Sequence, residues 1–556
     1  MQQFKKTISL FVSQINFKNN VIQKRFLTAI LLIFANIVIA SYLVPYYSKT
    51  IIESISAYNF YNIQSLILLF GIFWILEKST SHIQNIVFFP VINEAIKNIT
   101  FKVVNHIHNI SLIDYQQLSI SEITNCIRRI GMSARIFLKI ICLMIVPVII
   151  KFIISLVTVI KTIGLYGMIL FPAILIVGFV LYKLTVWYAA TREYAWKTTD
   201  KLIVRINDSM LNTKIVRNFK SFEMKDVGGL LDLEYLGWSE TNTRLHIINI
   251  IIVAFLGVIL IAILSAIVYF GQNINLTAGD FILLKTQLIA AFIPFIIFAD
   301  EYVQISGSLI DLNKIIKILE IPKELNQKNL QDNRDILKLF PGILCENISF
   351  SYSNQANNKY IFKNLSLHIN AGEKIGIVGA TGCGKSTLIN LIAGLYQPTK
   401  GKVYINGPNI IHCIPQDFKL FNLSIRYNLT YGLYDISEKA INQVLHQVGI
   451  YDLIAKMPSK LDTVAGEMGI RLSAGEKQKI VLARALLINP DILILDESTS
   501  SLNIEQEQSI LNVIYSLVPT VIISSHRTYT LRNLDRILKI QNGLLLEVEN
   551  KIFYDR

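Results

Sequence analysis

A glycine-rich loop is the segment of this 556-residue chain with the clearest chemical potential. It follows the apolar stretch 374–378, precedes the helical pattern 388–395 and has the spacing Gly-x-x-x-x-Gly-Lys-Ser. Glycines let consecutive backbone N–H groups point at one phosphate, while Lys385 reaches the β- and γ-phosphates and the Ser386 hydroxyl binds magnesium. We therefore predict a nucleotide and Mg²⁺ site in this P-loop at Gly379, Thr381, Gly382, Cys383, Gly384, Lys385, Ser386 and Thr387.

Two adjacent carboxylates end a second apolar stretch. Asp496 and Glu497 follow residues 492–495, and parallel sheets present catalytic groups at such strand ends. We expect Asp496 to hold Mg²⁺ through water and Glu497 to orient or deprotonate the water that attacks the γ-phosphate. Acidic pairs at strand ends also cap helices, so this interpretation depends on the P-loop upstream.

The elements that must position these residues fall into two parts. From about residue 343, short strands rich in Ile, Val and Leu alternate with helical patterns, which predicts an α/β domain with a largely parallel sheet. Upstream lie six apolar runs, and crossing a bilayer takes about 20 apolar residues. The runs are 26–44, 63–76, 136–160, 163–187, 245–270 and 281–299.

The second run is short and gives the weakest of the six spans, and the third contains Lys139 and Lys151. Lysines inside a span must reach the membrane surface with their side chains or face a cavity. We predict a multidomain chain, with an all-α six-helix transmembrane domain followed by an α/β P-loop ATPase domain. The boundaries are a basic N-terminal segment 1–25, the transmembrane domain with long inside helical loops 26–320, a linker 321–340 and the ATPase domain 341–556.

Composition and charge agree with a membrane protein. The chain is 52% hydrophobic and 17% charged, unlike ordinary soluble domains, and its net charge is +14. Lys and Arg concentrate before the first run and after the second and fourth, which predicts that these parts and the ATPase domain lie inside and that no nucleic acid binds. The basic N-terminus also fits an organelle-targeting segment. The five cysteines show no CxxC spacing and are interpreted as reduced thiols.

Further motifs carry a family resemblance. Residues 472–476, Leu-Ser-Ala-Gly-Glu, resemble the signature loop of ABC transporters. In the same order as in that family, Tyr352 matches the aromatic residue that stacks on adenine, Gln416 the Q-loop residue at the magnesium, and His526 the switch histidine. With six spans, the resemblance implies an ATP-driven half-exporter. ATP would lie between the P-loop of one subunit and Ser473 and Gly475 of its partner, in a homodimer or a heterodimer.

Within the exporters, four stretches are similar to the mitochondrial iron-sulfur/glutathione and heavy-metal tolerance group: 207–219, 277–280, 307–311 and 415–428. The resemblance implies that an anionic thiol, glutathione-linked or related to sulfur or iron-sulfur compounds, leaves the compartment that faces the ATPase. It also implies the inner membrane of a mitochondrion or a related organelle, or of a bacterium. The alternatives are export of lipids, hydrophobic peptides or drugs, and an ATP-binding channel or regulator that does not pump.

The chain departs from the family at both sites. In the ATPase domain, Ala474 replaces a glycine, Glu476 a glutamine and Asn503 an aspartate that helps couple the two active sites. At the expected substrate site, Arg192 and Asn249 remain, but Tyr188 replaces a first arginine and residues 251–252, Ile-Ile, replace a Gly-Gln pair. The resemblance thus implies a less polar cargo or a weaker contact with glutathione.

Overall fold

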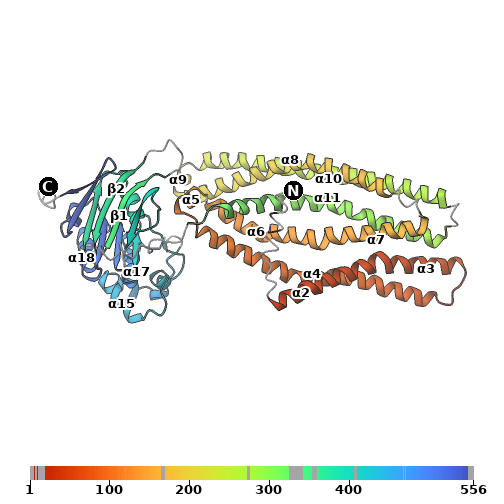
Figure 1. Ribbon diagram of the computed structural model, residues 1–556, viewed down its shortest axis with the longest axis horizontal. Coiled ribbons are helices and arrows are strands. Elements are labelled where there is room, and N and C mark those ends of the chain that lie inside the picture. The colour runs from red at the N-terminus through yellow and green to blue at the C-terminus, as the bar shows by residue number, and fades with distance from the viewer. Residues whose placement is uncertain are drawn as a thin grey trace. The chain divides into compact units, whose positions relative to one another are not determined.

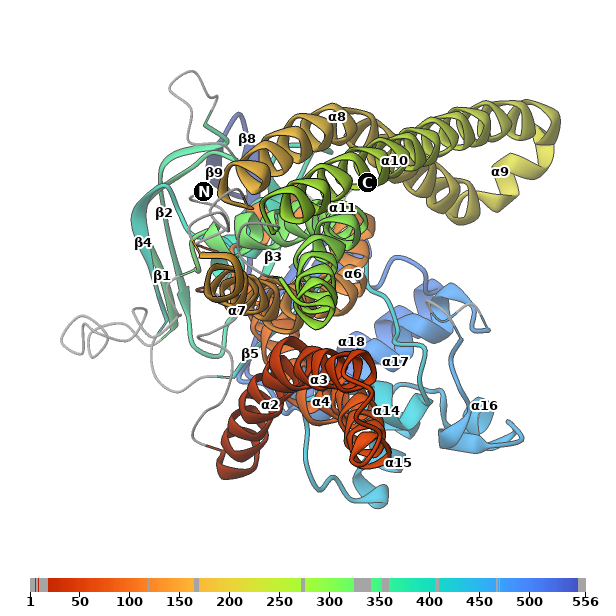
Figure 2. The same cartoon turned by 90° about the vertical axis from the view of Figure 1, so that its right-hand side faces the viewer.

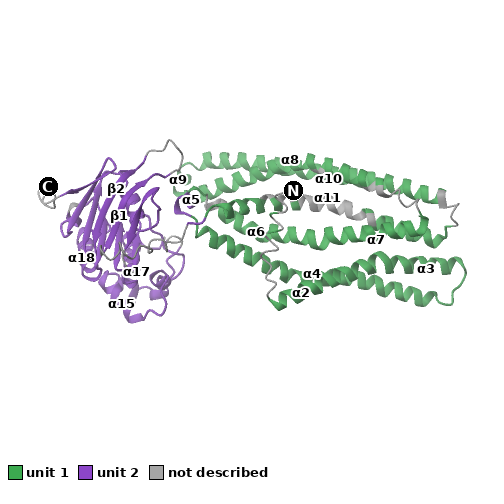
Figure 3. Ribbon diagram, in the orientation of Figure 1, with its two compact units in different colours: residues 1–110, 117–322 green, residues 111–116, 323–556 purple. Residues whose placement is uncertain are grey.

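The computed structural model describes residues 6, 9, 19–118, 120–164, 170–271, 276–324, 342–352, 360–405, 410–466, 469 and 471–548. The chain divides into two compact units (Figure 3). Unit 1 comprises Met1–Ile110 and Gln117–Pro322, and unit 2 comprises Ser111–Gln116 and Lys323–Arg556. Residues 325–340 of the predicted linker 321–340 and most of the predicted N-terminal segment 1–25 lie outside the described residues.

Unit 1 is built from helices. In chain order these are α2 (Asn20–Val38), η1 (Ile39–Leu43), α3 (Val44–Ser56), α4 (Ile63–Ile107), α6 (Ile120–Ile140), η2 (Ile141–Ile145), α7 (Val146–Ile163), α8 (Leu170–Leu211), α9 (Thr213–Asn218), α10 (Lys220–Gly271) and α11 (Ala278–Glu320). The long helices α8 and α10 run side by side (Figure 1). With 52 residues, α10 is far longer than the roughly 20 residues that cross a bilayer, so it continues well beyond its apolar part.

Four helical stretches are long and apolar enough to cross a membrane, counting only the described residues. They are Asn20–Ser56, Ile63–Ile107, Ile123–Ile163 and Lys220–Tyr269. The second of them contains the short run 63–76. The runs 163–187 and 281–299 fall largely in α8 and α11, and six spans with both termini inside stays a prediction.

Two π-helical turns, η1 and η2, interrupt the membrane helices. Each is followed by a Val-Pro pair, with Pro45 after η1 and Pro147 after η2. Proline has no N–H to donate to the carbonyl four residues earlier and its ring collides with that carbonyl, so the wider π-turn relieves the clash. The carbonyl of Ser41 instead accepts a hydrogen bond from the Gln287 amide of α11, and the Ser155 hydroxyl of α7 donates to the Gln287 carbonyl at 2.8 Å. These bonds join α11 to η1 and to α7.

Unit 2 contains two sheets (Figure 2). The smaller is antiparallel, in the order β2 (Phe362–Asn370), β1 (Gly342–Phe350), β4 (Lys400–Ile405). The larger has the order β5 (Ile411–Ile414), β6 (Ile492–Asp496), β7 (Thr520–Ser524), β3 (Lys374–Gly379), β8 (Arg536–Gln541), β9 (Leu544–Val548), and only β9 is antiparallel to its neighbour. The prediction of an α/β domain with a largely parallel sheet is confirmed, whereas the separate antiparallel sheet was not foreseen.

Helices of unit 2 pack with the strands of the larger sheet into hydrophobic cores. They are α13 (Lys385–Ile392), α14 (Ile425–Thr430), α15 (Glu438–Gln447), α16 (Tyr451–Ala455), α17 (Ala474–Leu487) and α18 (Ile504–Leu517), with the 3₁₀ turns η5 (Lys460–Asp462) and η7 (Thr528–Leu531). Every residue of β6 and β7 is buried. This explains their nearly uninterrupted Ile, Leu and Val, because a parallel strand is covered on both faces.

A short helix from the first half of the sequence belongs to unit 2. In α5 (Leu112–Gln117), Leu112 and Ile113 pack against the core that the two sheets share. The Tyr396 hydroxyl donates a hydrogen bond to Gln116 Oε1 at 3.5 Å. The ATPase unit is therefore discontinuous in sequence, whereas the sequence-based division placed these residues in the segment 26–320.

Candidate functional site

The P-loop connects β3 to α13 through a turn that requires glycine. Gly382 has φ +80° and Gly384 has φ +107°, a region that residues with a side chain rarely adopt. A Cβ on Gly384 would lie 2.8 Å from Phe362 Cζ, and one on Gly379 would lie 2.6 Å from Cys383 Sγ. The loop thus turns tightly into the first turn of α13, where free backbone N–H groups favour an anion. This geometry fits a nucleotide phosphate.

Lys385, the first residue of α13, is buried inside the loop. Its Nζ donates to the Gly379 carbonyl at 3.0 Å and to the Ala380 carbonyl at 3.4 Å. It also lies 3.8 Å from Glu497 Oε1. Its ammonium group is therefore held where the loop closes and beside the acidic end of β6.

Three predicted site residues converge on the Glu497 carboxylate. His526 Nε2 lies 2.8 Å from Oε1, and Gln416 Nε2 donates to Oε2 at 3.0 Å, while Lys385 is the third neighbour. Gln416 follows β5, Glu497 follows β6 and His526 follows β7, and these are adjacent parallel strands. Strand ends that point the same way bring their next residues together, which is where α/β sheets bind ligands. A carboxylate held in this way is placed to orient a nucleophile or to accept a proton.

Asp496 lies one residue earlier and is almost completely buried. The Ser524 hydroxyl donates to its Oδ1 at 2.6 Å, and the Glu497 N–H in turn donates to Ser524 Oγ at 3.0 Å. Among the described residues, no group of three or more His, Cys, Asp and Glu side chains could hold a metal. Mg²⁺ keeps several waters and takes only a few oxygen ligands from the protein. The chemistry of Ser386, Gln416 and Asp496 fits it, and their assignment as magnesium ligands stays a prediction.

Tyr352 offers an exposed aromatic face near the P-loop helix. Its side chain is 46% exposed, and its hydroxyl is 2.8 Å from Thr387 Oγ1. Its ring meets the rings of Phe350 and Tyr396 edge-on, with centroids 5.2 and 5.9 Å apart. Nearly half of this side chain is exposed, so the ring can stack on a planar base.

The signature residues form a separate helix start. Ser473 caps α17 in a reciprocal capping box, in which Ser473 Oγ accepts from the Glu476 N–H at 3.3 Å and Glu476 Oε2 accepts from the Ser473 N–H at 2.8 Å. Ala474 lies in the regular helix, and a Cβ on Gly475 would lie 3.5 Å from the Ser501 carbonyl. Glu476 therefore has a local structural role at the start of α17, and the capping box takes either glutamate or glutamine at this position.

Asn503 caps the helix that follows the catalytic loop. Its side-chain oxygen accepts a hydrogen bond from the Gln506 N–H at 2.8 Å, and this starts α18. Asparagine caps a helix about as well as aspartate does. The replacement retains the cap and removes only the charge.

A buried carboxylate that the sequence analysis did not single out holds this loop. Glu507 of α18 has no exposed surface and accepts hydrogen bonds from Thr499 Oγ1 at 2.6 Å, from the Tyr529 hydroxyl and from Arg527. Arg527 also donates to the carbonyls of Ser500 at 2.7 Å and of Leu502 at 3.1 Å. Although burial disfavours the charge of Arg527, hydrogen bonding to Glu507 raises its pKa. This Glu507–Arg527 clamp fastens the loop after Glu497 to the segment after His526.

The candidate substrate residues lie in unit 1 on different helices. Arg192 is on α8 and only 7% exposed, and Asn249 is half-buried on α10. Tyr188 and Ile252, two of the residues that depart from the family pattern, are buried together in an apolar cluster of α8, α10 and their neighbours. These departures therefore serve helix packing, and the arginine lies in the interior of unit 1.

Comparison with known proteins finds relatives that fit both units. A family model described as ABC transporter matches residues 362–500. The chain is 28% identical over 483 residues to the mitochondrial iron-sulfur clusters transporter ABCB7 of Oryzias latipes, which covers 84% of this chain and 64% of that protein. It is 29% identical over 487 residues to the ATM1-type heavy metal exporter of Novosphingobium aromaticivorans, which covers 84% of this chain and 78% of that protein.

The human mitochondrial ABCB7 transporter is 31% identical over 358 residues, or 61% of this chain, and only 47% of its own length is spanned. The chain thus spans less than two thirds of the first of these relatives and about half of the human one. A solved structure of a bacterial Atm1-family ABC exporter with ATP bound has a TM-score of 0.85 and 25% identity, and 96% of each chain is covered. The likeness in fold therefore extends over nearly the whole chain.

Proposed function

Because this chain is an ABC half-exporter of the Atm1/ABCB7 type in sequence and in fold, we propose that it uses ATP hydrolysis to move a substrate out of the compartment that faces its ATPase unit. The observation that carries the proposal is the convergence of Lys385, Gln416 and His526 on the Glu497 carboxylate. Such an arrangement has little use in a protein that only binds nucleotide.

Each residue has a role in this proposal. The P-loop N–H groups and Lys385 bind the β- and γ-phosphates, and Tyr352 stacks on adenine. Glu497 orients the attacking water and accepts its proton, while Gln416 and His526 hold the carboxylate in place. Ser386, Gln416 and, through water, Asp496 would hold Mg²⁺, which would supply neutralisation of the phosphate charge.

The proposal includes a dimer. The sequence of one chain carries one P-loop and one signature. Ser473 of the signature forms its hydrogen bonds with Glu476 at the start of its own helix, α17. In the family arrangement, Ser473 and Gly475 complete the ATP site of a second subunit. Since both Glu497 and the signature are present, two identical chains suffice, and a heterodimer is the alternative.

Monomers are expected to hydrolyse ATP only at the background rate. The measurement compares ATP turnover in nanodiscs that hold one chain with turnover in nanodiscs that hold two, with the chain number verified by crosslinking. ATP binding by the two preparations serves as the control, because the P-loop is complete in a single chain. Equal turnover per chain would exclude a composite site.

For the cargo, we propose glutathione-linked, sulfur or iron-sulfur-related compounds. The relatives named as iron-sulfur cluster transporters and as a heavy metal exporter support this class, as does the match at residues 207–219. Three basic residues that follow Arg192 on α8, Lys197, Lys201 and Arg205, would by charge alone concentrate anions along the approach. However, Lys197 pairs with Glu193, and Arg205 pairs with Glu223 and Asp226. Their attraction for anions is therefore weaker than the sequence alone indicates, and Arg192 is the stronger candidate for a direct contact. Relatives of both origins support an inner membrane, mitochondrial or bacterial.

Arg192→Ala is expected to weaken thiol binding and to raise the apparent dissociation constant at least several-fold, because losing a charged hydrogen bond costs about 1.5–3 kcal/mol. The measurement is ATPase stimulation and vesicle uptake with glutathione, oxidised glutathione, lipids and hydrophobic peptides. Lys197→Gln on the same helix is the matched control, because that side chain is exposed and paired with Glu193. Stimulation by lipids or peptides but not by thiols would overturn the cargo class and leave the exporter proposal standing.

A further inference from the structure

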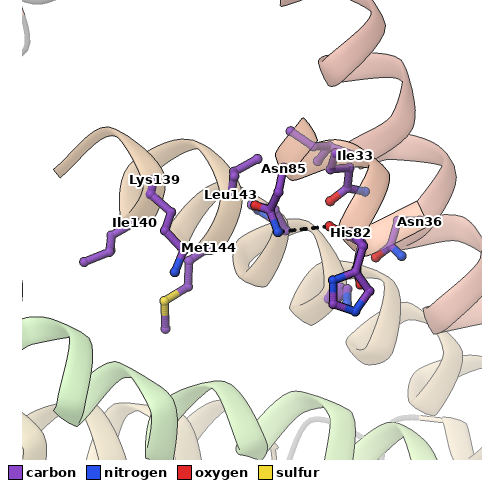
Figure 4. A pocket seen from close by; sticks show the side chains of 12 residues that line it. Ile33, Asn36, His82, Asn85, Lys139, Ile140, Leu143 and Met144 are labelled. Carbon is purple, nitrogen blue, oxygen red and sulfur yellow. Dashed lines mark hydrogen bonds between the residues drawn. The ribbon is translucent and has the colours of Figure 1, made fainter. Parts of the chain in front are cut away.

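A polar cavity lies among three of the apolar helical stretches of unit 1. It has a volume of about 330 Å³ and is lined from α2, α4 and the segment α6–η2–α7. Figure 4 shows Asn36, His82, Asn85 and Lys139 around it. Lys151 of α7 completes its polar lining together with two further side chains of α4. None of the residues assigned to ATP or to the thiol cargo lines this cavity.

The amide side chains of the lining are already engaged and fix its walls. Asn36 Nδ2 donates to the Glu77 carbonyl at 2.7 Å, and Gln84 Nε2 donates to the Leu32 carbonyl at 2.8 Å, so α2 and α4 are tied together in both directions. Asn85 Nδ2 donates to a carbonyl one turn earlier in α4 at 3.3 Å, the bond dashed in Figure 4. The strong donors that remain available to a ligand are the lysine ammonium groups.

Neither lysine forms a direct ion pair with a residue that the structure describes, although the charge of Glu77 reaches Lys151. Among the described residues, no acidic oxygen lies within 4.0 Å of Lys139 or Lys151, and Glu77 on the neighbouring helix pairs with Lys78 at 3.0 Å. The imidazole of His82 also lines the cavity. Charged side chains within a membrane span are costly and as a rule face a partner or a water-filled cavity. A cavity with two such cations therefore calls for an anion.

The π-turn η2 brings the two lysines to the same face. Lys151 follows Lys139 by 12 residues, which in a helix of 3.6 residues per turn would set them about 120° apart. A π-turn takes up one extra residue, so these positions rotate like about eleven and the offset falls to about 20°. Leu143 and Pro147, within and just after this turn, also line the cavity. The helical irregularity thus builds the site, as π-turns often do at functional positions.

We propose that this cavity binds the phosphate group of an anionic phospholipid. Basic pockets between transmembrane helices on the inside of a membrane bind such headgroups. The cavity is at the small end of the range for ligand pockets, so it fits a headgroup and not a whole lipid. Residues next in sequence to the lining are large, apolar and exposed, including Phe34 and Ile83, and offer a surface for acyl chains. A soluble phosphate would have no use for that surface.

The test is lipid retention by the purified full-length chain in a neutral detergent, measured by native mass spectrometry. We expect wild-type chains to retain phosphatidylglycerol at concentrations at which phosphatidylcholine is lost. The double variant Lys139→Gln/Lys151→Gln should lose this preference, with occupancy falling at least several-fold, and Lys139→Arg/Lys151→Arg should keep it. Lys161→Gln is the matched control, because this lysine is on α7 but does not line the cavity. Unchanged retention by the double glutamine variant would overturn the proposal.

A second measurement uses only the wild-type chain, so it does not depend on the stability of a variant. Phosphatidylglycerol should raise the melting temperature more than phosphatidylcholine does, and the absence of a difference would overturn the proposal. Inorganic phosphate, glycerol 3-phosphate and glutathione are added as competitors. Displacement of the lipid by either phosphate compound would assign the pocket to a soluble phosphate, and displacement by glutathione would assign it to the cargo; each result would refute a lipid site. None of these readouts depends on ATP turnover.

Discussion

Glu497→Gln is expected to lower ATP turnover by about 10²- to 10⁴-fold, the range for removal of a catalytic base. The amide fills the same volume and can still face Gln416 and His526, which lie 3.0 and 2.8 Å from the carboxylate oxygens. It cannot accept the proton of the attacking water. Because the P-loop and Tyr352 are unchanged, ATP should bind and remain trapped. The measurement is steady-state turnover together with retention of labelled ATP.

Glu505→Gln is the matched control for this prediction. Glu505 is an exposed acid in the first turn of α18, near the same loop, and the substitution makes the same chemical change. Wild-type turnover in Glu505→Gln with loss in Glu497→Gln assigns the effect to the site. Transport that continues at the wild-type rate in Glu497→Gln would contradict the pump and favour the channel or regulator.

Glu507→Ala is expected to lower the unfolding free energy of the ATPase unit by about 1–3 kcal/mol, because it removes a buried charged acceptor, while the Arg527 side chain, 34% exposed, can turn to water. Thr499, Tyr529 and Arg527 all lose the acceptor that joins them. The measurement is the first thermal transition of the full-length chain, read alongside ATP turnover. Turnover should also fall, because the loop after Glu497 and the segment after His526 are no longer fastened to each other.

Two variants separate the charge of Glu507 from its position. Glu505→Ala, on the exposed face of the same helix, should have little effect on stability. Glu507→Gln keeps a hydrogen-bond acceptor but removes the charge that faces Arg527, so we expect an intermediate loss. If Glu507→Ala were as stable as Glu505→Ala, the Glu507–Arg527 clamp would have no energetic weight.

The catalytic cluster of the ATP site could be predicted from sequence because Gln416, Glu497 and His526 each come within two residues of the end of a strand of the larger sheet. Strand ends in a parallel sheet converge, so the order of Gln416, Glu497 and His526 along the chain was sufficient to place them together. Glu507 could not be found in this way. It lies in an amphipathic helix among other polar residues, and only the fold shows that its side chain points inward to Arg527.

Other features depend on contacts that sequence periodicity does not record. Lys139 and Lys151 stood out in an apolar run, but a regular helix would separate them, and the π-turn that aligns them forms next to Pro147, which cannot join the regular helical hydrogen bonding. The antiparallel sheet that carries Phe350 beside Tyr352 pairs the consecutive strands β1 and β2 and takes its third strand, β4, from beyond β3 and α13. Leu112 and Ile113 are two apolar residues in a short segment, too few to define a period.

The discontinuity of unit 2 has a consequence for biosynthesis. The ribosome makes Ser111–Gln116 long before Lys323, where the rest of the unit begins. The apolar side chains of Leu112 and Ile113 therefore stay uncovered until the ribosome has made the strands and helices against which they pack. Such long-range closure is slow and leaves apolar surface open to aggregation, so insertion of the first membrane helices has to hold the nascent segment in reach. Unit 2 can thus be completed only late in synthesis, when the residues after Lys323 fold against Ser111–Gln116, which the helices of residues 117–322 separate from them in the sequence.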